Sequence, residues 1–184
     1  MPRIAPLSPP YEPGVGDALT AWMGGVDKEP LLLFRTLLRN EELASRMRVL
    51  GAGLLAHGKL PAADRELVVA RVCARSACRY EWSVHAAIFG EAVGFTADLL
   101  AATVTAPPDD PRWSPRQAAL LGAADELHRT AALSDPAWQA LAAHFDEDQI
   151  LEFLVLCGWY RTVAYLANGL RLESEPWSTP YPGT

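Results

Sequence analysis

Cysteine and basic residues are both scarce in this chain of 184 residues. It holds three cysteines, and so few, in an odd number, argue against the disulfide framework that stabilises small exported domains. Lysine and arginine together number 16 against 22 aspartates and glutamates, so the formal net charge is −6. Because a nucleic-acid-binding protein usually needs a basic face to neutralise phosphate groups, we expect no nucleic-acid partner.

Long apolar runs are lacking as well. A membrane-spanning helix needs about 20 consecutive apolar residues, and the longest apolar stretch, residues 150–158, is interrupted by Glu152. The N-terminal residues 1–6 lack the charged-then-apolar order of a signal peptide. We therefore expect a cytoplasmic protein with no membrane partner. Half of the residues are hydrophobic, which suffices for one buried core, so a single domain over residues 1–184 is predicted.

Proline is concentrated at the two ends of the chain, with five prolines in residues 1–16 and three in residues 175–184. Proline has no backbone donor and restrains the residue before it, so both ends are predicted to be extended arms. The C-terminal arm also carries Trp177 and Tyr181, whose apolar rings favour burial. We expect this arm to lie along the body of the protein or along a neighbouring subunit.

Between the arms the apolar residues recur with helical spacing, and no segment alternates with period two. The predicted fold class is therefore all-α. Start and stop signals such as Asn40, Pro61, Gly94 and Ser114 set the boundaries. The predicted helices cover residues 30–39, 41–56, 61–77, 80–93, a short span from Thr96 to before Pro107, 115–130, a helix opened by Asp135-Pro136 that includes Phe145, and 148–170. Segments 65–69 and 151–155 look alike, so an internal helical repeat stays open.

Four polar side chains are predicted to converge on one another. Glu66 lies on the helix 61–77, and Cys78 lies at the turn into the next helix. Glu81 and His85 are four residues apart and share a helix face. If the two helices pair antiparallel, two carboxyl groups, a thiol and an imidazole meet, and such clusters perturb their own pKa values as proton-transfer sites require.

Simpler structural roles compete with each of these functional interpretations. Glu66 could be a first-turn carboxylate stabilised by the helix dipole, and Cys78 could be an inert buried side chain like Cys73 and Cys157. A helix N-terminus and His85 favour a thiolate at Cys78, whereas the two glutamates oppose it. A metal site is the least favoured interpretation, and we expect no metal and no cofactor.

The spacing of these residues resembles the active-site signature of the carboxymuconolactone decarboxylase-like, or alkyl hydroperoxidase D-like, family. In that signature a glutamate is followed at +12 by Cys-x-x-Cys and a histidine lies seven residues after the first cysteine. Glu66, Cys78 and His85 match, while Glu81 stands at the second cysteine, as in a subgroup with Cys-x-Tyr-Glu-Trp. The resemblance extends over residues 31–176 and implies an all-α, alkyl hydroperoxidase D-like helical bundle that forms homo-oligomers: dimers, trimers or hexamers.

The loss of the second cysteine bears on the reaction that the resemblance implies. Glu81 cannot resolve a sulfenic acid, but the family's lactone decarboxylases work with acid/base groups alone. We therefore expect a lyase that uses proton transfer on a small carboxylated lactone or related organic acid. Its predicted catalytic residues are Glu66, Cys78, Glu81 and His85, and its predicted substrate-binding residues are Arg79, Tyr80 and Trp82, with Arg71, Arg75 or Arg79 as the cation for an acid substrate.

Two other functions stay open. A peroxiredoxin-like oxidoreductase would oxidise Cys78 with a hydroperoxide and reduce it with an external thiol. Alternatively, the chain could be a non-catalytic helical oligomer that kept the fold without the reaction.

Overall fold

The computed structural model describes residues 1–183, and within them the chain forms nine α-helices and no strand. The predicted all-α fold class is confirmed. The helices are α1 (Pro13–Met23), α2 (Leu32–Leu37), α3 (Glu41–Ala56), α4 (Ala62–Arg75), α5 (Arg79–Phe89), α6 (Ala97–Thr105), α7 (Pro115–Thr130), α8 (Asp135–Ala142) and α9 (Glu147–Leu170).

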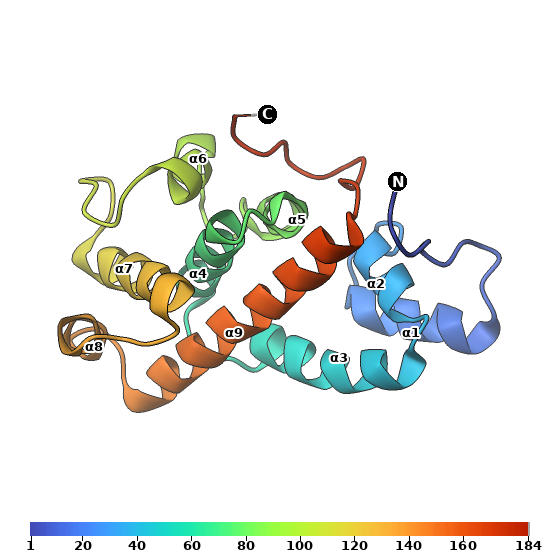
Figure 1. Ribbon diagram of the computed structural model, residues 1–184, viewed down its shortest axis with the longest axis horizontal. Coiled ribbons are helices and arrows are strands. Elements are labelled where there is room, and N and C mark those ends of the chain that lie inside the picture. The colour runs from blue at the N-terminus through green and yellow to red at the C-terminus, as the bar shows by residue number, and fades with distance from the viewer. Residues whose placement is uncertain (184) are drawn as a thin grey trace.

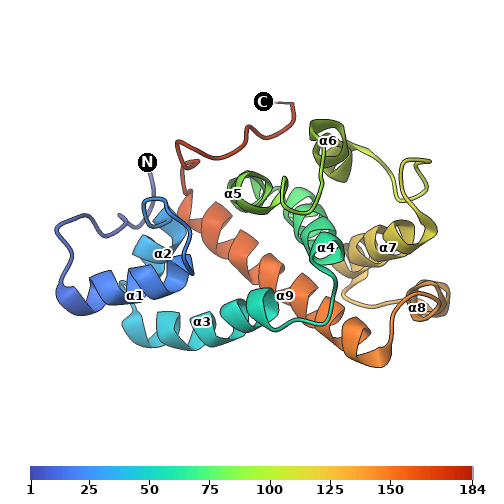
Figure 2. The ribbon, with the colours of Figure 1, turned by 180° about the vertical axis from the view of Figure 1, so that it is seen from behind.

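Helices α4 and α9 form the centre of the bundle. The α4 helix packs against α5, α6, α7 and α9. It contributes Leu67 and Val68 to the core, and both residues are fully buried. The α9 helix runs across the whole molecule, with α1–α3 on one side of it and α6–α8 on the other (Figure 1). Seen from behind, the same division holds (Figure 2). The site described below lies where α3, α5 and α9 approach one another.

By length and composition alone, α9 is apolar enough to cross a membrane, with a mean hydropathy of 1.4 over its most apolar window. In this structure 44% of that window is buried, and the helix contacts α3, α4, α5 and α8. Its inner face carries Phe153, Leu156 and Val163. Packing within the bundle therefore accounts for the apolar residues on this inner face.

Several predicted helix starts are confirmed by capping hydrogen bonds. The Asn40 side chain accepts from the Leu43 amide at 3.1 Å, and α3 has the predicted bounds. Ser114 forms a capping box with Gln117 at the start of α7, and Asp146 forms another with Gln149 at the start of α9. These starts were predictable because a cap satisfies its own helix's free amides within three residues.

Other boundaries differ from the prediction. Helix α1 begins at Pro13, inside the predicted arm, because proline suits the first position of a helix. Helix α5 ends at Phe89 instead of Val93, since Gly94 adopts a positive φ in a tight turn that returns the Phe95 amide to the Gly90 carbonyl. Helix α8 ends at Ala142, and α2 covers only part of 30–39. Phe145 follows α8, and the Cζ atom of Arg116 lies over its ring, 3.9 Å from the ring centre.

Both arms lie along the body of the protein, which confirms that expectation for the C-terminal arm. Glu175 is buried and its Oε1 accepts hydrogen bonds from the Leu32 amide, at 2.6 Å, and from the Tyr80 hydroxyl. The Tyr181 ring meets Trp82 edge-on at 5.2 Å. At the other end, the Arg3 amide donates to the Leu170 carbonyl at 2.8 Å. The two arms therefore meet the bundle near the end of α9.

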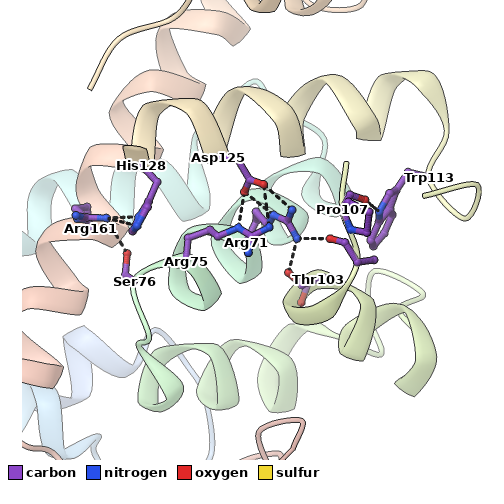
Figure 3. A network of polar contacts seen from close by, with 10 residues as sticks. Arg71, Arg75, Ser76, Thr103, Pro107, Trp113, Asp125, His128 and Arg161 are labelled. Atoms are coloured by element: carbon purple, nitrogen blue, oxygen red, sulfur yellow. Dashed lines mark hydrogen bonds and ion pairs between the residues drawn. The ribbon is translucent and has the colours of Figure 1, made fainter. Parts of the chain in front are cut away.

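A buried ionic network ties α4 to α6 and α7 (Figure 3). Both Arg71 and Arg75 donate two hydrogen bonds each to the Asp125 carboxylate, at 2.6–2.9 Å. Arg71, which is fully buried, also donates to the carbonyls of Thr103 and Ala106. This network occupies the guanidinium groups of both arginines, so neither supplies the free cation that we expected for an acid substrate.

Candidate active site

The turn between α4 and α5 brings the predicted site residues together. Ala77 adopts a left-handed conformation (φ 50°), and the Cys78 amide donates to the Cys73 carbonyl at 2.8 Å. This arrangement closes the end of α4 and makes Cys78 the N-cap of α5. The two helices then lie side by side, and the α5 face that carries Glu81 and His85 meets Glu66 of α4.

Glu66, Glu81 and His85 form a chain of polar contacts in the protein interior. His85 Nδ1 lies 2.7 Å from Glu66 Oε2, and His85 Nε2 lies 3.4 Å from Glu81 Oε1. The other oxygen of Glu66 accepts from Arg65 Nε at 3.0 Å. All three residues are at most 7% exposed. Three of the four side chains that were predicted to converge are thus joined by polar contacts.

The two members of the Glu66–His85 pair stabilise each other's charged form. Burial acts to lower the pKa of His85, but the Glu66 and Glu81 carboxyl groups outweigh it and raise this pKa to about 10. Burial likewise acts to raise the pKa of Glu66, but His85 and Arg65 outweigh it and lower that pKa. At neutral pH the pair is an imidazolium and a carboxylate, and both imidazolium nitrogens carry protons to donate.

A cavity of about 300 Å³ opens beside this chain, at the lower end of the roughly 300–1,000 Å³ typical of ligand sites. Its walls come from five helices and are almost entirely apolar. At its floor lie Glu81 and His85, together with Tyr160 of α9. The walls include Ala21, Trp22, Phe34, Arg48, Ala52, Ala56 and Trp159.

One polar atom of Glu81, a residue of the cavity floor, has no hydrogen-bond partner in the part of the chain that the structure describes. Glu81 is 6% exposed, and its Oε2 is buried without any hydrogen-bond partner among residues 1–183. A buried carboxyl oxygen is costly to leave unsatisfied, so such an atom marks a place where a ligand or a reacting group can bind. Glu81 can therefore contact a molecule in the cavity while His85 and Glu66 support it from behind.

Cys78 lies apart from the cavity. Its side chain is fully buried, and it is not among the lining residues. The neighbouring Cys73 interacts with it: burial, and then a hydrogen bond to the Cys78 thiol, raise the pKa of Cys73 well above its usual range. Cys157 is buried on α9, where burial also raises its pKa. Cys73 and Cys157 are core residues, as expected.

The three predicted substrate-binding residues also point away from the cavity. Tyr80 donates to Glu175, and Trp82 donates its indole N–H to the Thr103 hydroxyl at 3.0 Å. Arg79 is exposed, with its guanidinium 5.5 Å from the centre of the Tyr181 ring. The structure therefore uses this face of α5 to hold α6 and the C-terminal arm, and none of the three lines the cavity.

Three contributors to the site were missed from the sequence. The Tyr160 hydroxyl lies 3.1 Å from His85 Nε2, 75 residues along the chain. Arg65 supports Glu66, and Arg48 of α3 lines the cavity. The segment around Tyr160 formed part of the family resemblance, but no local pattern indicates which helix faces which.

Asp125 and His128, which lie three residues apart on α7, have separate partners in Figure 3. Asp125 binds Arg71 and Arg75, whereas His128 contacts Arg161. Burial and the Arg161 charge lower the pKa of His128. In the part of the chain that the structure describes, no three His, Cys, Asp or Glu side chains are grouped so as to hold a metal ion.

The fold is shared with several solved structures of low sequence identity. An uncharacterized peroxidase-related protein from a Silicibacter species superposes with a TM-score of 0.80 at 17% identity, covering 95% of this chain and 93% of that one. The debrominase Bmp8, solved with 2,3,4-tribromopyrrole, gives 0.80 at 14%, covering 95% and 92%. A peroxidase-related protein from Ralstonia eutropha, described as an alkylhydroperoxidase AhpD core, gives 0.79 at 17%, covering 94% and 93%. The molecule is thus an all-α protein of the alkyl hydroperoxidase D-like fold.

A family match comes from the sequence itself. Residues 41–126, which include Glu66, Cys78, Glu81 and His85, match the model of the Carboxymuconolactone decarboxylase family. Together with the shared fold, this match over residues 41–126 supports a carboxymuconolactone decarboxylase-like, alkyl hydroperoxidase D-like family for the chain. No curated protein matches it in sequence.

Proposed function

We propose that this protein is an enzyme that transfers protons to or from a small organic acid, such as a carboxylated lactone, bound in the apolar cavity. One observation carries the proposal: the polar chain from Glu66 through His85 ends on Glu81, which lines the cavity and whose buried Oε2 has no hydrogen-bond partner among residues 1–183. The family is named for a decarboxylase, and the same fold serves a debrominase, so enzymatic chemistry on small molecules suits both.

Each residue of the chain has a role that follows from its contacts. Glu66, held by Arg65, keeps His85 protonated and oriented. His85 is the proton donor, because its Nε2 reaches the cavity floor and its pKa of about 10 keeps it charged at neutral pH. Glu81 is the carboxyl group that contacts the substrate. Tyr160, bonded to the same Nε2, helps to fix the imidazole plane.

For a decarboxylation the steps balance without further reagents. The bond between the substrate carbon and its carboxylate breaks, and carbon dioxide leaves as a neutral molecule. The electron pair stays on that carbon, delocalised into a neighbouring carbonyl group, until His85 protonates it. An apolar wall and a nearby carboxyl group both disfavour the charged ground state relative to neutral carbon dioxide.

The test is to incubate the protein with a panel of carboxylated lactones in D₂O. Deuterium incorporation and carbon dioxide release are followed by NMR. We expect turnover by the native protein, loss of at least about 100-fold in His85→Ala because general acid catalysis is worth that much, and little change in His57→Ala, an exposed histidine outside the cavity. Turnover retained in His85→Ala would contradict the proposal. If no lactone is turned over and no small acid raises the melting temperature, the non-catalytic helical oligomer becomes the better interpretation.

Peroxide reduction at Cys78 is the second candidate, favoured by its place at the N-cap of α5 beside the Cys73 thiol. The peroxide O–O bond would break, leaving a sulfenic acid and an alcohol, and an external dithiol would then reduce the sulfenic acid to the thiol and water. The burial of Cys78 opposes this reading. Rapid, selective oxidation of Cys78 by stoichiometric hydroperoxide, mapped by mass spectrometry, would support it, whereas slow oxidation of all three cysteines would remove it.

A further inference from the structure

The cavity mouth lies between α1 and α3, opposite the α5 and α9 side chains of the floor. Ala21, Ala52 and Ala56 line the cavity and are exposed to solvent. By contrast, Glu81, His85 and Tyr160 are at most 7% exposed. A ligand therefore enters past α1 and α3, and its leading end meets the proton-transfer groups.

Arg48 stands at this mouth with no anionic partner. Its side chain lines the cavity and is half-buried, and no hydrogen bond, ion pair or ring contact joins it to any residue from 1 to 183. Its neighbour Arg46, one turn away from Glu42 on the same helix, is paired with that residue at 2.9 Å. An unpaired guanidinium at the rim of an otherwise apolar cavity is a site for an anion, and its planar fork matches a carboxylate.

The floor of the cavity has the opposite preference. Glu81 lines the floor, the charge of the His85 imidazolium beside it is already paired with the Glu66 carboxylate behind it, and the surrounding walls are apolar. A substrate carboxylate beside Glu81 would suffer like-charge repulsion as well as loss of solvation. A monoanionic ligand is therefore most stable with its charge at the mouth and its neutral end at the floor.

From this arrangement we infer that the substrate is an apolar molecule anchored by a carboxylate on Arg48, and that the proton transfer takes place at its opposite end. Arg48 is accordingly a residue that determines specificity and touches the substrate without touching the reacting bond. This inference rests on the proposed function and narrows it: the anchoring carboxylate does not react, so a substrate that is decarboxylated at the floor carries a second carboxyl group there. The apolar body of the ligand would lie against Trp22, Phe34 and Trp159.

A matched pair of probes separates charge from shape. The native protein is titrated with 4-phenylbutyrate and with 4-phenylbutyramide, which have the same size and differ in charge. Binding is followed by the fluorescence of Trp22 and Trp159, which line the cavity, and by calorimetry. We expect the carboxylate to bind about tenfold or more tightly than the amide, since a charge-assisted hydrogen bond contributes that much.

The variants decide the role of Arg48. In Arg48→Gln the preference for the carboxylate should fall to within about twofold, and in Arg48→Lys most of it should remain. Arg46→Gln, on the same helix but outside the cavity lining, is the matched control and should keep the native preference. An unchanged preference in Arg48→Gln, or none in the native protein, would overturn the inference.

The anchor and the proton-transfer function can fail separately. If Arg48→Gln leaves the preference intact while His85→Ala abolishes lactone turnover, the anchor is wrong and the proton-transfer function stands. If the preference depends on Arg48 but no lactone turns over, the anchor stands and the reaction must be revised.

Discussion

The Glu66–His85 pair sets the protonation state of the candidate site. A histidine buried alone would be neutral, because burial disfavours its charged form. Here the adjacent carboxyl groups reverse that effect, and the histidine stays charged well beyond neutral pH. The pair contributes stability that is complete below the ordinary histidine pKa, about 6.5, and that is lost as the pH rises toward about 10.

At the residue scale, Glu66→Gln should make the site sensitive to mild alkali. With the carboxylate gone, the pKa of His85 should fall by about 1–3 pH units, as expected when an opposite charge is removed. We expect the alkaline limb of the native kcat/KM profile near the His85 pKa of about 10, and in Glu66→Gln this limb should move to lower pH by that amount. Histidine ring signals in NMR give the same pKa without a substrate.

The matched control is Glu42→Gln, which neutralises an exposed glutamate on α3 and should leave the profile in place. The stability gap between pH 7 and pH 10, measured by urea unfolding, should also be smaller in Glu66→Gln than in the native protein. A His85 pKa that is the same in both would show that Glu66 does not hold the proton there.

At the scale of elements, α4 is the central helix of the bundle and packs against α5, α6, α7 and α9. One of its faces carries Glu66 and Cys73 toward α5, and another carries Arg71 and Arg75 toward α7, where Asp125 binds both (Figure 3). Because these groups share one rigid helix, the ionic network fixes the position of α4 from which Glu66 reaches His85. The network therefore has a structural role, and its loss should lower the free energy of unfolding instead of removing a group that reacts.

Asp125→Ala should be among the most destabilising single changes outside the apolar core. It leaves the fully buried Arg71 cation without its carboxylate, and removing one partner of a buried pair costs about 3–5 kcal/mol. Urea unfolding followed by circular dichroism measures this as a lower midpoint. Glu42→Ala, which removes the exposed partner of Arg46, should change little. Equal midpoints for the two variants would contradict a central role for the network.

At the scale of the whole molecule, one face of α9 is apolar and uncovered within the single chain. Leu151, Val155 and Tyr165 are 62%, 45% and 64% exposed, and their spacing, with the exposed Gly158, places them along one stripe of the helix. Exposed apolar stripes of this kind mark association sites. We propose that this stripe packs against another copy of the chain, in line with the homo-oligomer that the family resemblance implies.

Val155→Glu should therefore reduce the size of the assembly. A charge at the centre of an apolar interface is costly to bury, so light scattering after gel filtration should show a smaller species than the native protein. Ala140→Glu introduces the same charge at an exposed position on α8 and should leave the mass unchanged. An unaltered mass for Val155→Glu would place the interface elsewhere.

Features that depend on neighbours along the chain could be predicted from the amino-acid sequence. The all-α class follows from the spacing of apolar residues, and the starts of α3, α7 and α9 follow from caps that act within three residues. Glu81 and His85 share a face because they lie four apart on one helix. The contact of Glu66 with these two residues could be predicted because a short turn joins α4 and α5, which favours antiparallel pairing of the two helices.

Which faces of the helices meet could not be predicted in this way, because it depends on contacts between residues far apart in the chain. Tyr160 approaches His85 across 75 residues of sequence, and the cavity exists because helices from both halves of the chain enclose it. For the same reason Tyr80 and Trp82 turned out to face the C-terminal arm and α6, and Arg48 rather than Arg71 or Arg75 stands free at the mouth. A helix carries several candidate faces at once, and the packing of its neighbours selects the one that becomes a site.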